Sequence, residues 1–284
     1  MTADEDNHLR SWIGRTQTAT ELVSPRIAHQ LAATLDYDRP PQMGETLPPL
    51  WHWALFPDIA THSQISTDGH PKRGGFLPPI SLPRRMWVAS RVRFERSLLV
   101  GSEVTRTSQI LDVASKEGRS GKLVFVRIRH DLENHHGPLI SEEQDVVYRD
   151  ATPAGYTAAT GPLAPADSTW SRKVVPDPVL LFRYSADTFN AHRIHYDRAY
   201  ATSQEGYPAL VVHGPLTATL LLDLLKRELP EEEIASFSFK AVNPLFDDAP
   251  FHVCAAHASG STDVRLWAVN HTGVLCVEAT AKLR

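Results

Sequence analysis

The stretch Leu216–Leu225 limits the possible folds of this chain more than any other segment. Leucines at positions 216, 220, 221, 224 and 225 predict a helix that is apolar on most of its sides. A surface helix keeps one polar face, so other elements must enclose this one. Gly214-Pro215 supplies its start, because proline is favoured in the first helical turn. Four segments rich in β-branched and aromatic residues follow and predict an antiparallel meander: Ser236–Val242, Phe251–Ala258, Val264–Asn270 and Val274–Ala279.

The first half of the chain repeats this order. Ser24 is a good N-cap, and Pro25 suits the first helical position. Four predicted strands follow: Trp87–Arg96, Val104–Ser115, Leu123–His130 and Ser141–Arg149. A helix followed by an antiparallel sheet, present twice, predicts an α+β double hotdog in which each sheet wraps around a helix.

The boundaries of the two hotdogs follow from a proline-rich seam. We expect an N-terminal hotdog over residues 1–150, a linker over 151–178 and a C-terminal hotdog over 179–284. The seam cannot continue a helix or a central strand, because it contains five prolines: Pro153, Pro162, Pro165, Pro176 and Pro178. Directly after it, Val179–Ser185 is predicted to be a strand.

Composition and charge exclude several classes of protein. The 29 Lys and Arg against 33 Asp and Glu give a net charge of −4, without the basic surface that nucleic-acid binding requires. No run of about 18 apolar residues could span a membrane, and the acidic N-terminus is unlike a signal peptide. Two cysteines suffice neither for a disulfide framework nor for a four-cysteine zinc site. We therefore expect a cytoplasmic protein with no nucleic-acid and no membrane partner.

Side chains suited to acid–base chemistry concentrate between Tyr184 and Asp197. These 14 positions contain two His, two Asp, two Tyr, an Asn and an Arg. A second polar point, His213-Gly214, stands where the buried helix begins. Free backbone N–H groups and the positive end of the helix dipole suit a developing oxyanion there. A general base facing such donors is a minimal site for chemistry next to a carbonyl.

Other interpretations of these residues stay open. A histidine-rich loop is often a hydrogen-bonded structural segment. His192 and His195 could be two metal ligands, but a third would have to come from elsewhere, so we expect no metal and no cofactor. The signatures of serine hydrolases and of dinucleotide-binding proteins are absent from the sequence. Trp51-His52-Trp53 is predicted to be core or pocket wall.

The cluster resembles the MaoC-type hydratases, also called hydratase 2, which have the hotdog fold. Three positions depart from that motif. Asn190 stands where the family has its catalytic Asp, His192 where it has Asn, and Arg193 where it has Pro. The matching residues are Tyr184, Ile194, His195, Asp197, His213 and Gly214.

A wider resemblance covers nearly the whole chain. Phe189–Asp197 and Gly206–Pro215 are similar to a subgroup that contains the mitochondrial hydroxyacyl-thioester dehydratase type 2 and the bacterial mesaconyl-C4-CoA and itaconyl-CoA hydratases. Gly69–Pro79, Pro83–Trp87 and Lys116–Gly121 are similar to its N-terminal domain. The resemblance implies reversible addition of water to a CoA thioester, a branched C5 dicarboxylic enoyl-CoA, to give citramalyl-CoA.

The resemblance also implies roles for single residues. His195 would be the general base, and His213 with the backbone N–H of Gly214 would form the oxyanion site. Asn190 would orient the water, because an amide has no titratable proton. Either His195 then acts as base and as acid, or Asp187 or Asp197 supplies the acid.

A free carboxylate on the substrate needs a cation. Arg193 is the first candidate, with Arg84 and Arg85 as alternatives, since a guanidinium can bind a carboxylate through two hydrogen bonds. Tyr184 is expected to contact the substrate. Two other functions stay open: a 3-hydroxyacyl-thioester dehydratase of fatty acid metabolism, and a non-catalytic acyl-CoA-binding hotdog. Hotdog domains pair, so both a monomer and a homodimer are compatible with this chain.

Overall fold

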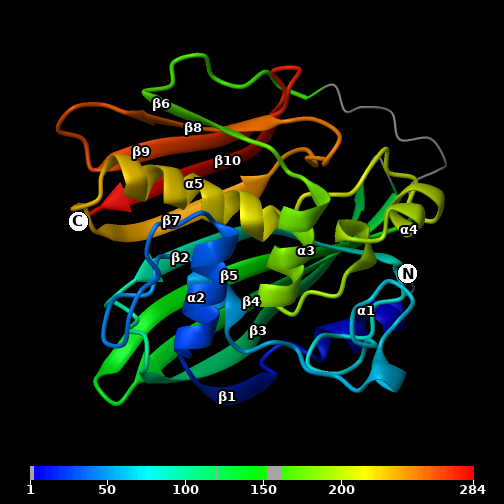
Figure 1. Ribbon diagram of the computed structural model, residues 1–284. Coiled ribbons are helices and arrows are strands. Elements are labelled where there is room, and N and C mark those ends of the chain that lie inside the picture. The colour runs from blue at the N-terminus through cyan, green and yellow to red at the C-terminus, as the bar shows by residue number, and fades with distance from the viewer. Residues whose placement is uncertain (1–2, 119–120, 152–160) are drawn as a thin grey trace.

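Ten antiparallel strands form one continuous sheet, and the helices α2, α3 and α5 lie on the same face of it (Figure 1). The computed structural model describes residues 3–118, 121–151 and 161–284. The strand order is β1-β3-β4-β5-β2-β7-β10-β9-β8-β6, so each half of the chain contributes five neighbouring strands. The two halves meet where β2 pairs with β7. This arrangement confirms the α+β hotdog prediction, with the two sheets joined edge to edge.

The strand boundaries agree closely with the alternation of apolar residues in the sequence. Along β4, the buried residues alternate with more exposed ones, as expected of a sheet with one solvated face. The strands are β1 Thr16–Leu22, β2 Arg84–Phe94, β3 Glu103–Gly118, β4 Gly121–Asn134, β5 Gly137–Arg149, β6 Trp170–Val174, β7 Ile234–Ala241, β8 Phe251–His257, β9 Asp263–Val269 and β10 Leu275–Leu283. Sequence patterns missed β1, which is polar and mostly exposed at the sheet edge.

The apolar helix is enclosed as predicted. Helix α5, Gly214–Glu228, buries every residue from Leu216 to Leu225 and contacts β6, β8, β9 and β10. No helix of the described ranges is long and apolar enough to cross a membrane.

The first half covers its sheet in a different way. Helix α2, Pro25–Thr34, begins at the predicted cap, where Ser24 Oγ accepts a hydrogen bond from the Arg26 N–H. The helix has only ten residues, and the short 3-10 helix η1, Trp51–Ala54, fills the core beside it. Helix α1, Ala3–Arg10, covers the far end of the sheet with Leu9.

The predicted strand Val179–Ser185 is wrong, because these residues belong to helix α3, Pro178–Asp187. Asp177 caps this helix by accepting hydrogen bonds from the N–H groups of Val179 and Leu180. A short apolar run fits a buried strand and a helix equally well, and the Asp-Pro start signal decides between them. Helices α2 and α3 each begin with a capping residue followed by proline, and they pack side by side (Figure 1).

The predicted linker 151–178 contains an element of the sheet. Strand β6 lies within it and pairs with β8 from Trp170↔Ala255 to Val174↔Phe251. Residues 152–160 of this segment, like residues 119–120 of the motif Lys116–Gly121, lie outside the described part of the chain. The division into two hotdogs at this segment stays a proposal.

The buried carboxylate of Asp223 allows a test of which interactions stabilise the packing of α5. The carboxylate of Asp223 is nearly inaccessible and accepts from Arg172 at 2.6 Å and from Arg227 at 3.0 Å. Arg227 also donates to the carbonyls of Leu35 and Asp36 at the end of α2. The exposed Glu228 on the same helix serves as the control.

We expect Asp223→Ala to lower the free energy of unfolding by about 3 kcal/mol, since it leaves the partly buried guanidinium groups of Arg172 and Arg227 without their carboxylate partner. Glu228→Ala should change it by no more than about 0.5 kcal/mol. Urea denaturation measures both variants, and equal effects would contradict a stabilising role for the buried pair.

Candidate active site

The polar cluster lies at the junction of the two halves. It occupies the segment between α3 and α5, which includes the 3-10 helix η3, Arg193–His195, and helix α4, Arg198–Ser203. The start of α5 lies against β2, since a Cβ on Gly214 would be 3.7 Å from the carbonyl oxygen of Trp87. The β2–β5 register shifts between Trp87 and Ala89 at the same point. Both sheets therefore contribute walls to this site.

His195 is held in one tautomer. Its Nδ1 is 2.7 Å from the carbonyl oxygen of Val211, and a carbonyl can only accept, so Nδ1 carries the hydrogen. The other ring nitrogen, Nε2, then has a free lone pair. Burial lowers the pKa of His195 to about 4, because the charged imidazolium is disfavoured away from water. His195 is consequently a neutral proton acceptor at ordinary pH.

His213 stacks on His195 at the start of α5. The two ring centroids are 3.7 Å apart, and His213 is fully buried as the N-cap residue of the helix. Its Nε2 is 2.8 Å from Ser185 Oγ, whereas its Nδ1 has no hydrogen-bond partner in the described structure. Tyr184 of α3 contacts the His213 ring edge-on at 5.1 Å. An unpartnered buried nitrogen next to free helix N–H groups is a place for a polar ligand atom.

Two further imidazoles extend this stack into a row. His192 lies 5.5 Å from His195, ring centroid to ring centroid, and His70 lies 4.3 Å from His192. His70 comes from the first half of the chain, and its Nδ1 donates to Asp68 at 3.3 Å. Burial lowers the pKa values of His70, His192 and His213 as well. We call the four residues His70, His192, His195 and His213 the histidine row.

The loop that carries His70 packs through its backbone against the segment between α3 and α5. The Arg193 N–H donates to the carbonyl of Asp68 at 2.9 Å, and the Arg193 side chain donates to the carbonyl of Thr67 at 3.0 Å. Gly69 lies so close to Ala191 that an added Cβ would be 1.8 Å from the Ala191 carbonyl oxygen. Its φ of +95° also requires glycine. The two loops therefore form one unit.

The Arg193 guanidinium has partners within the protein. It donates to Asp197 at 2.7 and 3.0 Å and lies 4.2 Å from the centre of the Tyr200 ring. Asp197 is in turn the N-cap of α4, accepting from the Tyr200 N–H at 3.0 Å. Both side chains thus organise the loop, a use that competes with the roles expected for them as carboxylate clamp and acid.

Some of the other predicted site residues also have partners within the protein, and others keep free hydrogen-bonding groups. Arg84 is buried in an ion pair with Glu205, at 3.2 Å. Asp187 accepts from Thr34 of α2 at 2.7 Å and lines the groove between α2 and α3. Asn190 accepts from the His192 N–H through Oδ1 at 3.1 Å, and its amide NH₂ has no hydrogen-bond partner in the described ranges. The Arg85 guanidinium, by contrast, has no hydrogen-bond partner in the described ranges, and its positive charge contributes to lowering the pKa values of His70 and His192.

Three potential metal ligands occur at one end of the row. Donor atoms of Asp68, His70 and His192 lie within 4.8 Å of one another. The guanidinium of Arg85 opposes a second cation here, and His70 already uses Nδ1 for Asp68. The expectation of no metal stays a prediction.

The Trp51-His52-Trp53 motif lies in the core. Glu142, buried on β5, accepts hydrogen bonds from His52 Nε2 at 3.2 Å, from Trp53 Nε1 and from Ser90 Oγ. Burial alone would raise the pKa of Glu142, but the bonds from His52 and Ser90 hold it at about 2. The motif therefore satisfies a buried carboxylate, in agreement with the core prediction.

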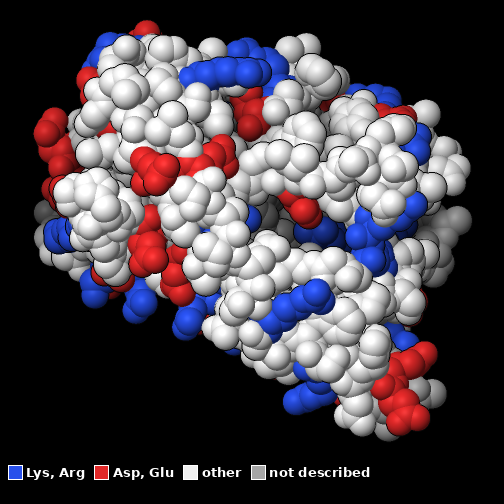
Figure 2. All heavy atoms as spheres, turned by 90° about the horizontal axis from the view of Figure 1, so that it is seen from below, with Lys and Arg blue, Asp and Glu red and all other residues white. Residues whose placement is uncertain are grey.

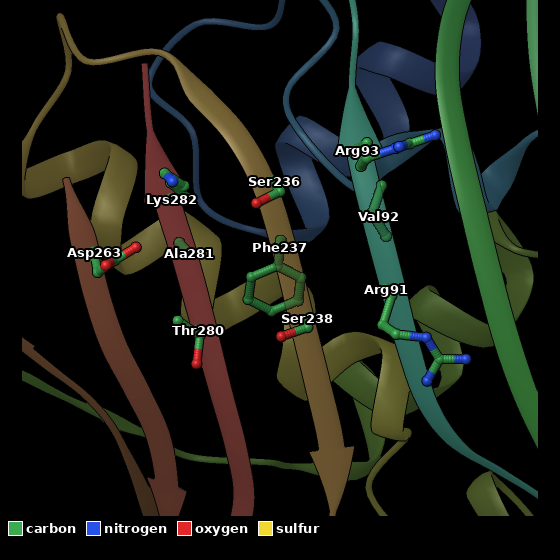
Figure 3. A pocket seen from close by; sticks show the side chains of 10 residues that line it. All are labelled: Arg91, Val92, Arg93, Ser236, Phe237, Ser238, Asp263, Thr280, Ala281 and Lys282. Atoms are coloured by element: carbon green, nitrogen blue, oxygen red, sulfur yellow. The ribbon is translucent and has the colours of Figure 1, made fainter.

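Two hollows of the surface lie outside the histidine row. A depression of about 240 Å³ lies over β2, β7 and β10, lined by Arg91, Ser236 and Thr280 among others (Figure 3). A groove of about 580 Å³ separates α2 from α3 and is lined by Arg26, Arg183 and Asp187 among others. Figure 2 shows a hollow near the centre of the lower face, with Lys and Arg side chains beside it.

Sequence analysis named Arg84 and Arg85 of the first half but missed Asp68 and His70. These two residues lie about 120 residues before the polar cluster, and no periodicity connects the two segments. The available signal was Gly69-His70-Pro71, since a glycine and a proline flanking a histidine mark a turn of defined shape.

Comparison with known proteins identifies the family. A profile of the family "Hydroxyacyl-thioester dehydratase type 2" matches residues 50–247, which include both halves of the site. The chain belongs to this family. It is an enzyme of the hydratase and dehydratase type, a hydro-lyase.

Individual relatives support the assignment. The chain is 46% identical over 279 residues to the mesaconyl-C4-CoA hydratase of Chloroflexus aurantiacus, covering 96% of this chain and 97% of that protein. It is 27% identical over 236 residues to the mitochondrial hydroxyacyl-thioester dehydratase type 2 of Schizosaccharomyces pombe, covering 74% and 77%. Among solved structures, a MaoC-like dehydratase of Phytophthora capsici is similar in fold, with a TM-score of 0.70, 15% identity and coverage of 98% and 97%.

The buried histidines predict how stability depends on pH. In the unfolded chain they titrate near pH 6.5, whereas the folded pKa values of His195 and His130 are about 4. Between these pH values the unfolded state binds more protons, so the free energy of unfolding should fall as pH drops below about 6.5. Urea denaturation at about pH 7.5, 6.5 and 5.5 measures this slope. His195→Gln should make the slope shallower and the exposed His29→Gln should not; equal slopes would contradict the argument.

Proposed function

We propose that this enzyme adds water reversibly to a branched C5 dicarboxylic enoyl-CoA of the mesaconyl-C4-CoA type and forms citramalyl-CoA. The observation that carries the proposal is His195, a neutral imidazole whose Nδ1 is bonded to the Val211 carbonyl and which stacks on the N-cap of α5. The 46% identity to a mesaconyl-C4-CoA hydratase over nearly the whole chain supports the substrate class.

The reaction begins with proton transfer from water. Nε2 of His195 accepts a proton from the water while its oxygen forms a bond to the β-carbon of the alkene. The electron pair of the double bond moves to the thioester, whose oxygen becomes an enolate near the Gly214 N–H. The first N–H groups of α5 and its dipole stabilise this charge.

The second step returns a proton to the α-carbon. The enolate collapses, and His195 gives up the proton that it took from water, so the product gains one H and one OH and the enzyme is restored. Asn190 cannot supply this proton, because an amide does not titrate in the working range. Asp197 is bonded to Arg193, and Asp187 to Thr34, so His195 alone serves as base and then as acid.

The same chemistry favours one C5 isomer. In mesaconyl-C4-CoA the double bond is conjugated with the thioester, so attack at the β-carbon places charge on the carbonyl oxygen. In itaconyl-CoA the double bond is one carbon further away and cannot use the start of α5 in this way. Stabilisation of an oxyanion therefore favours the conjugated ester.

A second candidate function is dehydration of 3-hydroxyacyl thioesters of fatty acid metabolism. It is favoured by the family profile and by the relative in Schizosaccharomyces pombe, whose names describe that activity. A third, a non-catalytic acyl-CoA-binding hotdog, is suggested only by Asn190 in place of a catalytic carboxylate. We also propose that the enzyme acts in the cytoplasm, and that its joined sheet halves allow either a monomer or a homodimer.

The substrate class is tested with three thioesters. We expect rapid hydration of mesaconyl-C4-CoA, slower hydration of itaconyl-CoA and slow hydration of crotonyl-CoA, because only the first has both conjugation and a free carboxylate. Product formation is measured by liquid chromatography. Preference for crotonyl-CoA would assign the enzyme to fatty-acyl metabolism, and tight binding without turnover would indicate the non-catalytic alternative.

The general base is tested by His195→Gln. This variant should lower kcat by roughly 10³-fold, because a positioned base contributes about 10²–10⁴-fold. Asn190→Ala should cost only about tenfold, because a group that orients water loses one hydrogen bond. Circular dichroism checks the fold of both variants. If His195→Gln retains full turnover, His195 is not the base.

A further inference from the structure

Arg85 is a cation without a protein partner in a site where other arginines have one. Arg84 pairs with Glu205, and Arg193 pairs with Asp197. No hydrogen bond or ion pair joins the Arg85 guanidinium to any residue of the described ranges, although the residue is only partly exposed. A guanidinium without a protein carboxylate is free to bind a ligand carboxylate through two hydrogen bonds.

His192 beside it is also unpartnered. Its surface is 9% exposed, and neither ring nitrogen has a hydrogen-bond partner in the part of the chain that the structure describes. An imidazole nitrogen without a protein partner can hydrogen-bond to a ligand. His70 and His192 lie at one end of the histidine row, 4.3 Å apart, and the positive charge of Arg85 contributes to lowering the pKa of each. Arg85 precedes by two residues Trp87, whose carbonyl oxygen lies against Gly214 at the start of α5.

The carboxylate of this cluster, Asp68, already has hydrogen-bond partners within the protein. Asp68 accepts from the His70 backbone N–H at 3.0 Å and from His70 Nδ1 at 3.3 Å. Its carboxylate also lies in the field of Arg73. Asp68 thus fixes His70 behind His192, and Arg85 keeps its hydrogen-bonding capacity.

We propose that Arg85 and His192 form the subsite that binds the free carboxylate of the substrate, with His70 supporting His192. The proposal rests on the proposed function and names its specificity residues. It replaces Arg193 by Arg85 as the carboxylate clamp.

The position of the subsite agrees with the chemistry of the substrate. In mesaconyl-C4-CoA the free carboxylate is attached to the β-carbon, the atom that water attacks. Its binding site must therefore adjoin the general base, and His192 is the neighbour of His195 in the row, at 5.5 Å. In crotonyl-CoA a methyl group replaces this carboxylate, and Arg85 would stay unpaired.

Arg85 should also assist the reaction. An anionic carboxylate on the β-carbon repels the oxygen of the incoming water as it gains negative character. Pairing with a guanidinium offsets this repulsion at the carbon that reacts. Loss of Arg85 should accordingly affect both KM and kcat for the dicarboxylic substrate.

Binding of two stable thioesters tests the subsite without turnover. Succinyl-CoA carries a carboxylate on its β-carbon, whereas butyryl-CoA carries a methyl group there. Isothermal titration should give at least about thirtyfold tighter binding of succinyl-CoA to the native enzyme, as expected for about 2 kcal/mol from a charged hydrogen-bonded pair. In Arg85→Gln this preference should disappear, and in Arg85→Lys it should be intermediate, because a lysine keeps the charge but not the two-bond geometry.

Kinetics provide a second readout. The ratio of kcat/KM for mesaconyl-C4-CoA over crotonyl-CoA should fall roughly a hundredfold in Arg85→Gln. His192→Asn should lower the same ratio by a smaller factor. The matched control is Arg93→Gln, which removes an exposed arginine from the same strand and should leave both measurements unchanged.

Each outcome decides the proposal. Equal preference for succinyl-CoA in the native enzyme and Arg85→Gln would overturn it, and so would a variant that no longer binds either thioester, because the subsite must be separable from CoA binding. If the native enzyme fails to hydrate mesaconyl-C4-CoA but its succinyl-CoA preference depends on Arg85, the subsite stands and the proposed function is wrong.

Discussion

The antiparallel pairing of β2 with β7 is the interaction on which the site depends. It joins the two five-stranded halves from Ala89↔Lys240 to Arg93↔Ser236. The Trp87 carbonyl oxygen of β2 lies against Gly214, so the pairing places β2 beside the start of α5. A chain in which the halves separated would keep His195 and His213 but lose this neighbouring strand. The candidate site therefore depends on one strand–strand contact.

Burial of the histidine row sets the chemistry of the site. Four imidazoles in contact cannot all carry charge in a medium of low polarity, so they stay neutral and act as proton acceptors. Asn190 adds no charge, whereas the hydrogen bonds from His70 outweigh burial, lower the pKa of Asp68 and keep its carboxylate anionic. The proposed carboxylate subsite therefore depends on Arg85, the cation beside the row whose guanidinium has no hydrogen-bonded carboxylate in the described ranges. The same burial makes the fold sensitive to acid.

Local patterns predicted the parts of the fold that depend on nearby residues. Sequence patterns predicted the eight strands of the two meanders, the cap at Ser24 and the apolar helix after Gly214. Hydrophobic periodicity and helix-capping residues act over only a few positions, so they can be recognised locally. The segment Val179–Ser185 was misread because a short apolar run suits both a strand and a helix. His195 and His213 were identifiable from a motif, but the partner of each arginine was not. Arg193 was the predicted carboxylate clamp, but its guanidinium pairs with Asp197 and lies over the Tyr200 ring.

Local sequence patterns predicted eight of the described strands, the buried helix, the α+β hotdog class and the residues able to carry acid–base chemistry. Those properties follow from side-chain periodicity and from the chemistry of single residues. Which side chains meet depends on the tertiary structure: His70 lies beside His192, Arg193 pairs with Asp197, and the Arg85 guanidinium has no hydrogen-bond partner in the described ranges. Contacts between residues about 120 positions apart depend on how the two halves pair. Their register comes from packing over the whole sheet, which no short pattern contains.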